Sequence, residues 1–153
     1  MARRSRAFST ALLLAAGFFA TALELDLGAG AKIDVAPYGI ENITALAFAA
    51  SWIGPREGIQ AGLVAAGSTG PSKTDLELSA CLRAWPVKDA VALLGGAGYL
   101  VEAAGPGPSQ LPILIGALRL EAGNLALLAC AEVHFEGYDT DTMFWLAALW
   151  RVR

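Results

Sequence analysis

The sequence has few charged side chains, a single histidine, two cysteines and no excess of basic residues. Charged residues make up 16% of its 153 residues, whereas an average soluble domain has about 25%. Lysine and arginine number 11 against 14 acidic residues, so no basic patch is expected to neutralise phosphates, and nucleic acid is not an expected partner. One histidine and two cysteines supply few metal ligands, and we expect neither a metal nor another cofactor.

Long uninterrupted hydrophobic stretches are also lacking, although hydrophobic residues make up 56% of the chain. Uncharged runs such as residues 43–54 and 90–101 reach about 12 residues, whereas a transmembrane helix needs roughly 18 to 20. A helical membrane protein is therefore not predicted. A tilted transmembrane β-strand needs only about 9 to 11 residues, and these runs have that length.

The N-terminus is organised as a secretory signal peptide. Three arginines among the first six residues precede an apolar stretch over residues 11–20, and residues 20–22 (Ala-Thr-Ala) provide a small-x-small cleavage signal. We expect residues 1–22 to be removed and residues 23–153 to form a single domain.

From residue 23 onward, hydrophobic and polar residues alternate in almost every segment. Along residues 23–35, leucine, alanine, isoleucine and valine alternate with Glu24, Asp26, Lys32 and other polar or glycine residues. Successive side chains of a strand point to opposite faces, so such a strand lies between an apolar and a polar environment. Seven more alternating segments follow, at about residues 43–53, 58–66, 75–85, 91–102, 113–121, 125–136 and 142–153.

The links between these eight segments alternate in kind. Longer links rich in proline and glycine (residues 36–41, 67–74, 103–112 and 137–141) alternate with tighter ones (residues 54–56, 86–89 and 123–124). Long loops at one end and short turns at the other are typical of bacterial outer-membrane barrels. The prediction is an all-β fold, an eight-stranded antiparallel up-and-down transmembrane β-barrel, with both termini on the periplasmic side.

One face of each predicted strand is free of charge, and we expect it to point outward to lipid. In the second strand this outward set is Leu46, Phe48, Ala50 and Trp52. Trp85 and Trp145 fall in the inward phase, although a bulge before Pro86 could rotate Trp85. Five aromatic residues are predicted at the membrane interfaces, Trp52 and Trp150 near the periplasmic ends and Tyr99, Phe135 and Phe144 near the extracellular ends.

The opposite faces carry the charges together with small residues, and we expect them to line a polar interior that side chains fill. Internal salt bridges are expected, because buried charges without partners are strongly destabilising. Cys81 and Cys130 also point inward, from strands that are not neighbours, and should remain unlinked. The predicted lumenal polar network consists of Glu24, Asp26, Glu77, Arg83, Arg119, Glu121, Glu132, His134, Glu136, Arg151 and Arg153.

His134 is the one residue of this set that suggests chemistry, since Glu132 and Glu136 flank it on the same face. The trio could bind a metal or relay protons. A lone histidine between carboxylates more often belongs to a structural network, and we favour that interpretation. No serine is placed near His134 and no G-x-S-x-G motif exists, so we expect no catalytic residues.

With these features the chain resembles the small eight-stranded outer-membrane proteins of the OmpA-barrel and OmpX/OmpW type. The resemblance covers nearly the whole mature chain and rests on its strand pattern. It implies a location in the outer membrane, contact with its lipids, insertion by the outer-membrane assembly machinery and loops that can contact a surface ligand. The chain departs from the family at its end, which is Arg153 in place of an aromatic residue.

Several functions are compatible with this architecture. A structural or surface-interaction role without turnover is the leading interpretation. A narrow channel for ions or small solutes is the alternative, although the interior of an eight-stranded barrel is filled by side chains. A lipid-modifying enzyme, or a soluble periplasmic ligand-binding barrel with its apolar face inward, fits the sequence less well.

Overall fold

A computed structural model describes residues 24–36, 39–70, 74–102, 109–136 and 139–152. The predicted signal peptide and Arg153 lie outside these ranges. The regular structure of the described part is β-strand, and no helix there is long and apolar enough to cross a membrane.

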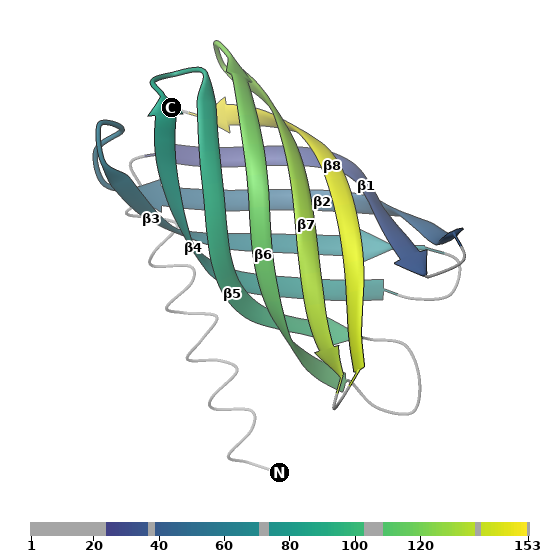
Figure 1. The fold of residues 1–153 in the computed structure, drawn as a ribbon. Helices are drawn as coiled ribbons and strands as arrows, with labels where there is room; N and C mark the ends of the chain where they lie inside the picture. The colour runs from purple at the N-terminus through teal and green to yellow at the C-terminus, as the bar shows by residue number, and fades with distance from the viewer. Residues whose placement is uncertain (1–23, 37–38, 71–73, 103–108, 137–138, 153) are drawn as a thin grey trace, which may run out of the picture.

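Eight strands form one closed sheet, in which each strand pairs antiparallel with its neighbours in the sequence and the first strand pairs with the last (Figure 1). This order confirms the predicted eight-stranded up-and-down barrel. The strands are β1 (Glu24–Ala36), β2 (Gly39–Ile53), β3 (Ile59–Thr69), β4 (Thr74–Val87), β5 (Val91–Glu102), β6 (Ser109–Ala122), β7 (Leu125–Glu136) and β8 (Asp139–Val152).

Because the number of strands is even, β1 begins and β8 ends at the same end of the barrel, which we call the terminal end. The connections β2–β3, β4–β5 and β6–β7 lie there too (Figure 1). The β6–β7 connection is a two-residue hairpin in which Gly123 has a φ of 68°, a left-handed conformation that glycine adopts without strain. We call the opposite end the loop end.

The predicted contrast between long loops and short turns is wrong. The strands continue past their predicted ends, so the connections at the loop end shrink to residues 37–38, 70–73, 103–108 and 137–138. The connections at the terminal end comprise residues 54–58, 88–90 and 123–124, so the two ends differ little in the lengths of their connections. The prediction failed because prolines and glycines were read as loop residues, whereas Pro112 lies within β6 at an outward position opposite Tyr99.

The predicted orientation of β2 is also wrong. Leu46, Phe48, Ala50 and Trp52 face the interior, and Trp52 is completely buried. The sequence of this strand holds no charge between Asn42 and Ile53 that could distinguish its two faces. Packing determines the orientation of β2, because its large side chains fill the interior while alanines at 45, 47 and 49 face outward. Gly62 of β3 makes the room, since a Cβ there would lie 2.4 Å from Cε3 of Trp52.

The interior consequently contains an apolar core as well as charges, which differs from the predicted polar lumen of small residues. Phe48 and Trp145 meet at its centre, with their ring centroids 5.5 Å apart. Trp145 and Trp85 keep the inward phase, even though the β4–β5 register does shift between Ala84 and Val87. The other large members of this core are Leu46, Trp52, Val64, Leu94, Leu100, Ile113, Ile115, Leu128 and Leu149.

The corrected orientation of β2 predicts that Phe48→Ala will destabilise the barrel much more than Phe144→Ala. Phe48 is buried against Trp145, so truncating its ring leaves a cavity and should lower the free energy of unfolding by about 3–5 kcal/mol. Phe144 lies on the outer face, where truncation leaves no cavity. Denaturant unfolding of the refolded protein in detergent micelles measures both. Equal losses, or a larger loss for Phe144→Ala, would contradict this orientation.

Candidate functional site

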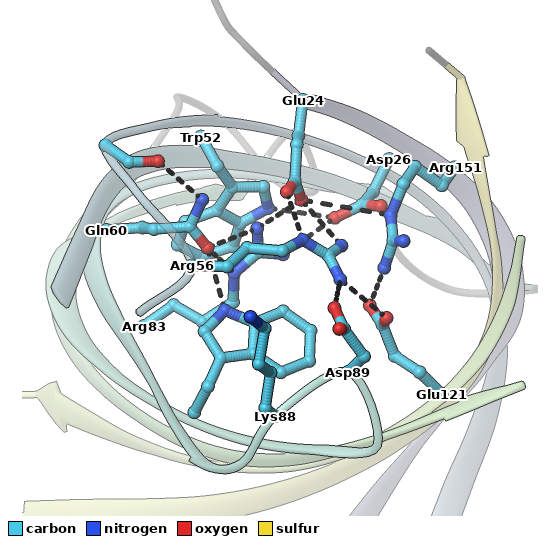
Figure 2. Close-up of polar contacts among 12 residues, drawn as sticks. Glu24, Asp26, Trp52, Arg56, Gln60, Arg83, Lys88, Asp89, Glu121 and Arg151 are labelled. Carbon is cyan, nitrogen blue, oxygen red and sulfur yellow. Dashed lines mark hydrogen bonds and ion pairs between the residues drawn. The ribbon is translucent and has the colours of Figure 1, made fainter. Parts of the chain in front are cut away.

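Charged side chains from six parts of the chain converge inside the barrel at the terminal end (Figure 2). The antiparallel order explains this convergence: inward residues at the start of β1 meet inward residues at the ends of β4, β6 and β8. The β2–β3 and β4–β5 connections add one residue each. We call this set the terminal cluster: Glu24, Asp26, Arg56, Arg83, Asp89, Arg119, Glu121 and Arg151.

Asp26 lies at the centre of the terminal cluster and is completely buried. Its Oδ2 atom accepts hydrogen bonds from Trp52 Nε1 at 2.9 Å and from Arg83 Nη1 at 3.3 Å. Arg119 donates to both carboxylate oxygens, with 2.9 Å between Nη2 and Oδ1. A buried carboxylate thus receives two guanidinium groups and one indole, and charge-assisted bonds of this kind are the stronger ones.

Arg56 closes the cluster from the β2–β3 connection. It donates to Glu24 in a two-pronged arrangement, with Nε–Oε1 and Nη2–Oε2 distances of 2.5 and 3.1 Å. It also reaches Asp89 at 2.6 Å and Glu121 at 3.3 Å, and so connects two turns with β1 and β6. Partial burial opposes its charge, but the hydrogen bonds with Glu24 and Asp89 prevail and raise the pKa of Arg56.

Aromatic rings hold the arginines in place. The guanidinium carbon of Arg83 lies 4.2 Å from the ring centroid of Trp52 and 5.1 Å from that of Trp85, and Arg56 lies 4.5 Å from Trp85. Gln60 joins the two components, because its Oε1 atom accepts from Trp85 Nε1 at 2.8 Å and from Arg83 Nε at 3.0 Å. Figure 2 shows these side chains gathered within the ring of strands.

The terminal cluster is electrically balanced. It contains four arginines and four carboxylates, and each arginine contacts at least two of the carboxylates. Outside it, Lys88 and Glu57 form an exposed pair at 2.9 Å, which lowers the pKa of Glu57 and raises that of Lys88 through their hydrogen bond. The terminal cluster is therefore neutral and densely hydrogen-bonded.

A second polar group lies nearer the loop end, and we call it the loop-side cluster: Lys32, Glu77, Glu132 and His134. Lys32 Nζ contacts Glu77 Oε1 and lies 3.1 Å from Glu132 Oε2. His134 Nε2 lies 3.1 Å from the same oxygen of Glu132. No side chain of this cluster is more than 4% exposed.

Glu77, Glu132 and His134 bring their polar atoms within 4.8 Å of one another, so the cluster must be tested as a metal site. Two carboxylates and an imidazole are suitable ligand types for a divalent ion. However, the buried ammonium group of Lys32 contacts both carboxylates and already supplies the positive charge between them. The donor set therefore fits an internal ion pair, and we derive no metal chemistry from it.

The structure places nine of the eleven predicted lumenal residues in these two clusters. Glu136 has the inward phase of Glu132 and His134 but is exposed at the loop end of β7, outside both clusters, and Arg153 lies outside the described residues. The predicted network did not include five residues that contact or belong to the two clusters: Lys32, Arg56, Gln60, Trp52 and Trp85. The alternation of β1 already pointed Lys32 inward, whereas nothing in the sequence shows that Arg56 folds from a turn back into the barrel.

Other predicted positions can be placed as well. Cys81 and Cys130 are both buried and free. Tyr99, Phe135, Phe144 and Trp150 are exposed on the outer face, while Trp52, predicted at an interface, lies inside. The error at Trp52 has the same cause as the reversed orientation of β2.

No protein-family model and no curated protein sequence matches the chain. Solved structures do match it. The N-terminal β-barrel domain of Pseudomonas aeruginosa OprF superimposes with a TM-score of 0.57 at 10% identity, over 84% of this chain and 97% of that chain. The chain shares the fold of small eight-stranded outer-membrane β-barrels.

Two further structures show how varied the roles of this fold are. Ail, the attachment invasion locus protein of Yersinia pestis, has a TM-score of 0.56 at 11% identity, over 84% of this chain and 97% of that chain. The outer membrane enzyme PagL has a TM-score of 0.52 at 12% identity, over 85% and 99%. The likeness establishes the fold and leaves the activity open.

The terminal cluster predicts that Asp26→Asn will destabilise the barrel by about 3–5 kcal/mol, because it leaves two buried arginines short of a carboxylate. Glu57→Gln is the matched control, and its exposed pair with Lys88 should leave stability unchanged. Denaturant unfolding in detergent, followed by tryptophan fluorescence, compares them. An Asp26→Asn protein as stable as wild type would show that the cluster does not depend on this carboxylate.

Proposed function

We propose that this protein spans the outer membrane and has a structural or surface-interaction role, with a plugged interior and neither turnover nor conduction. The outer face of the barrel is the observation that carries the proposal. Twenty-one large hydrophobic residues are more than a third exposed, and among the described side chains no charged residue occupies an outward strand position. Soluble proteins rarely expose contiguous apolar surface on this scale, whereas lipid solvates it.

The aromatic residues of the outer face support insertion in a bilayer. Trp150 is 54% exposed at the terminal end of β8. Tyr99, Phe135 and Phe144 are exposed toward the loop end. Tryptophan and tyrosine favour membrane interfaces, so these side chains would mark the two edges of the lipid-facing band.

The inner face argues against a soluble ligand-binding barrel and against a channel. Charges point inward and apolar side chains outward, which is the reverse of what a soluble barrel with an apolar cavity requires. The terminal cluster closes one end, and the apolar core around Phe48 and Trp145 fills the middle. Eight strands leave no further width for a continuous water path.

An enzymatic role has less support. His134, the only histidine of the sequence, is 2% exposed and contacts Glu132 inside the barrel. A substrate in the lipid phase would have no access to its imidazole. The predicted signal peptide favours export, lipids of the outer membrane and its assembly machinery are the proposed partners, and the connections at the loop end are the proposed contact with a surface ligand.

We expect the protein to remain in the outer-membrane fraction after an alkaline wash. We also expect it to migrate differently on gels before and after boiling, because a closed barrel resists detergent until heated. Release by the wash with identical migration would contradict the proposal.

Two lysine substitutions test whether the outer face contacts lipid, and the second is the control for the first. Leu78→Lys places a charge on the outer face of β4 and should cost about 2–4 kcal/mol against hydrocarbon, which lowers the folded fraction. Thr69→Lys, exposed at the loop end of β3, should cost much less. Equal folded fractions of the two variants would indicate that the outer face is exposed to water and not to lipid.

We further expect the purified protein to produce no stable conductance steps in planar bilayers, with a water-filled porin as the positive control. Persistent steps that vanish on heat denaturation would support a narrow channel. Such steps would overturn the plugged interior while leaving the membrane location intact.

A further inference from the structure

The loop-side cluster, unlike the terminal cluster, has unequal numbers of acidic and basic groups. Lys32 supplies one positive charge, and Glu77 and Glu132 supply two negative charges. A neutral His134 adds none. If both carboxylates were ionised, the four side chains would bury one uncompensated negative charge, which is costly in a medium of low polarity.

Among the residues that the structure describes, the side chains packed around the cluster supply no second positive charge. Its cross-strand neighbours on β2, β3, β5, β6 and β8 are uncharged except Asp141, which is acidic and exposed: Thr44, Ala66, Leu100, Ile113, Ile115, Asp141, Met143 and Trp145. Asp34 on β1 and Asp75 on β4, one inward position closer to the loop end, are acidic as well. On β7, Cys130 is a buried thiol, as is Cys81 on β4.

One oxygen in the cluster also lacks a donor. Glu132 Oε2 contacts both Lys32 and His134, but Glu132 Oε1 is fully buried and has no hydrogen-bond partner. Polar atoms of Glu77 and His134 lie within 4.8 Å of the Glu132 carboxylate. A proton on the Glu77 carboxyl or on the imidazole would turn an acceptor into a donor at this place.

We propose that the loop-side cluster binds one proton, in addition to the one on Lys32, when the folded barrel is at neutral pH. The proton is shared among Glu77, Glu132 and His134, and it makes the buried cluster neutral. Such strongly interacting groups titrate as a unit, so the proposal concerns the cluster and not one residue.

The proposal makes the barrel a pH-sensitive device. In the unfolded chain glutamate loses its proton near pH 4.3 and histidine near pH 6.5, so by about one pH unit above 6.5 the unfolded chain holds almost none of either proton. The folded barrel then holds one proton more than the unfolded chain. Stability must therefore fall as the pH rises, with the unfolding constant increasing by up to about tenfold per pH unit.

The test compares the pH dependence of unfolding for wild type, Glu77→Gln and Glu57→Gln in detergent micelles. The useful window is about pH 7 to 8, because histidine is still partly protonated in the unfolded chain below it, and thiols such as Cys81 and Cys130 ionise in the unfolded chain near pH 8.5. In Glu77→Gln one carboxylate faces one ammonium, so the extra proton is not needed. The unfolding free energy of this variant should therefore not change with pH in this window. Glu57→Gln, which alters an exposed carboxylate, should keep the wild-type slope.

A measurement on wild type alone covers the case in which Glu77→Gln fails to fold. Unfolding near pH 7.5, followed by calorimetry in two buffers of different ionisation enthalpy, should release about one proton per molecule. The proposal would be overturned if unfolding released no proton. It would also be overturned if the unfolding free energy of wild type depended on pH no more than that of Glu77→Gln. The result does not depend on membrane location, so its failure is distinguishable from failure of the proposed function.

Discussion

Closure of the sheet between β1 and β8 is the constraint from which the other features of this structure follow. Once the sheet closes, every inward side chain enters one narrow interior, where a charge is stable only beside an opposite charge. Asp26 and Arg119 are 93 residues apart in the chain, yet they form a two-pronged ion pair because β1 begins at the end of the barrel where β6 ends. Trp52 and Trp85 then pack on the guanidinium of Arg83.

The interior divides into three zones with different consequences. The terminal cluster is neutral and dense, and its bonds join turns to strands. The apolar core around Phe48 and Trp145 separates it from the loop-side cluster. In the loop-side cluster one carboxylate lacks a counter-charge, so a proton can bind where the terminal cluster needs none. With the proton that we propose there, the stability of the barrel responds to pH.

Much of this architecture could be predicted from the sequence, because the period of two in a strand needs no tertiary information. Six of the eight strands carry charge on one face, as β4 does with Glu77 and Arg83. β3 has no charge, and its polar Gln60 lies on the buried face. In β2 no charge distinguishes the faces, and the prediction failed there. The predicted strand ends at the loop end were wrong for a related reason. Pro112 was assigned to a loop, although its outward position in β6 is compatible with strand pairing.

By itself, the sequence determined that there are eight alternating segments, which face carries charge in most of them, and that the chain has fewer charged residues than an average soluble domain. Tertiary structure alone decided which charges pair, because partners such as Arg56 and Glu24 are set by barrel register and by the fold of a turn. It also decided the orientation of β2, where the volume of Trp52 beside Gly62 outweighs any pattern of polarity. Side-chain period is a local property of the chain, whereas volume and charge compensation depend on what the closed barrel brings together.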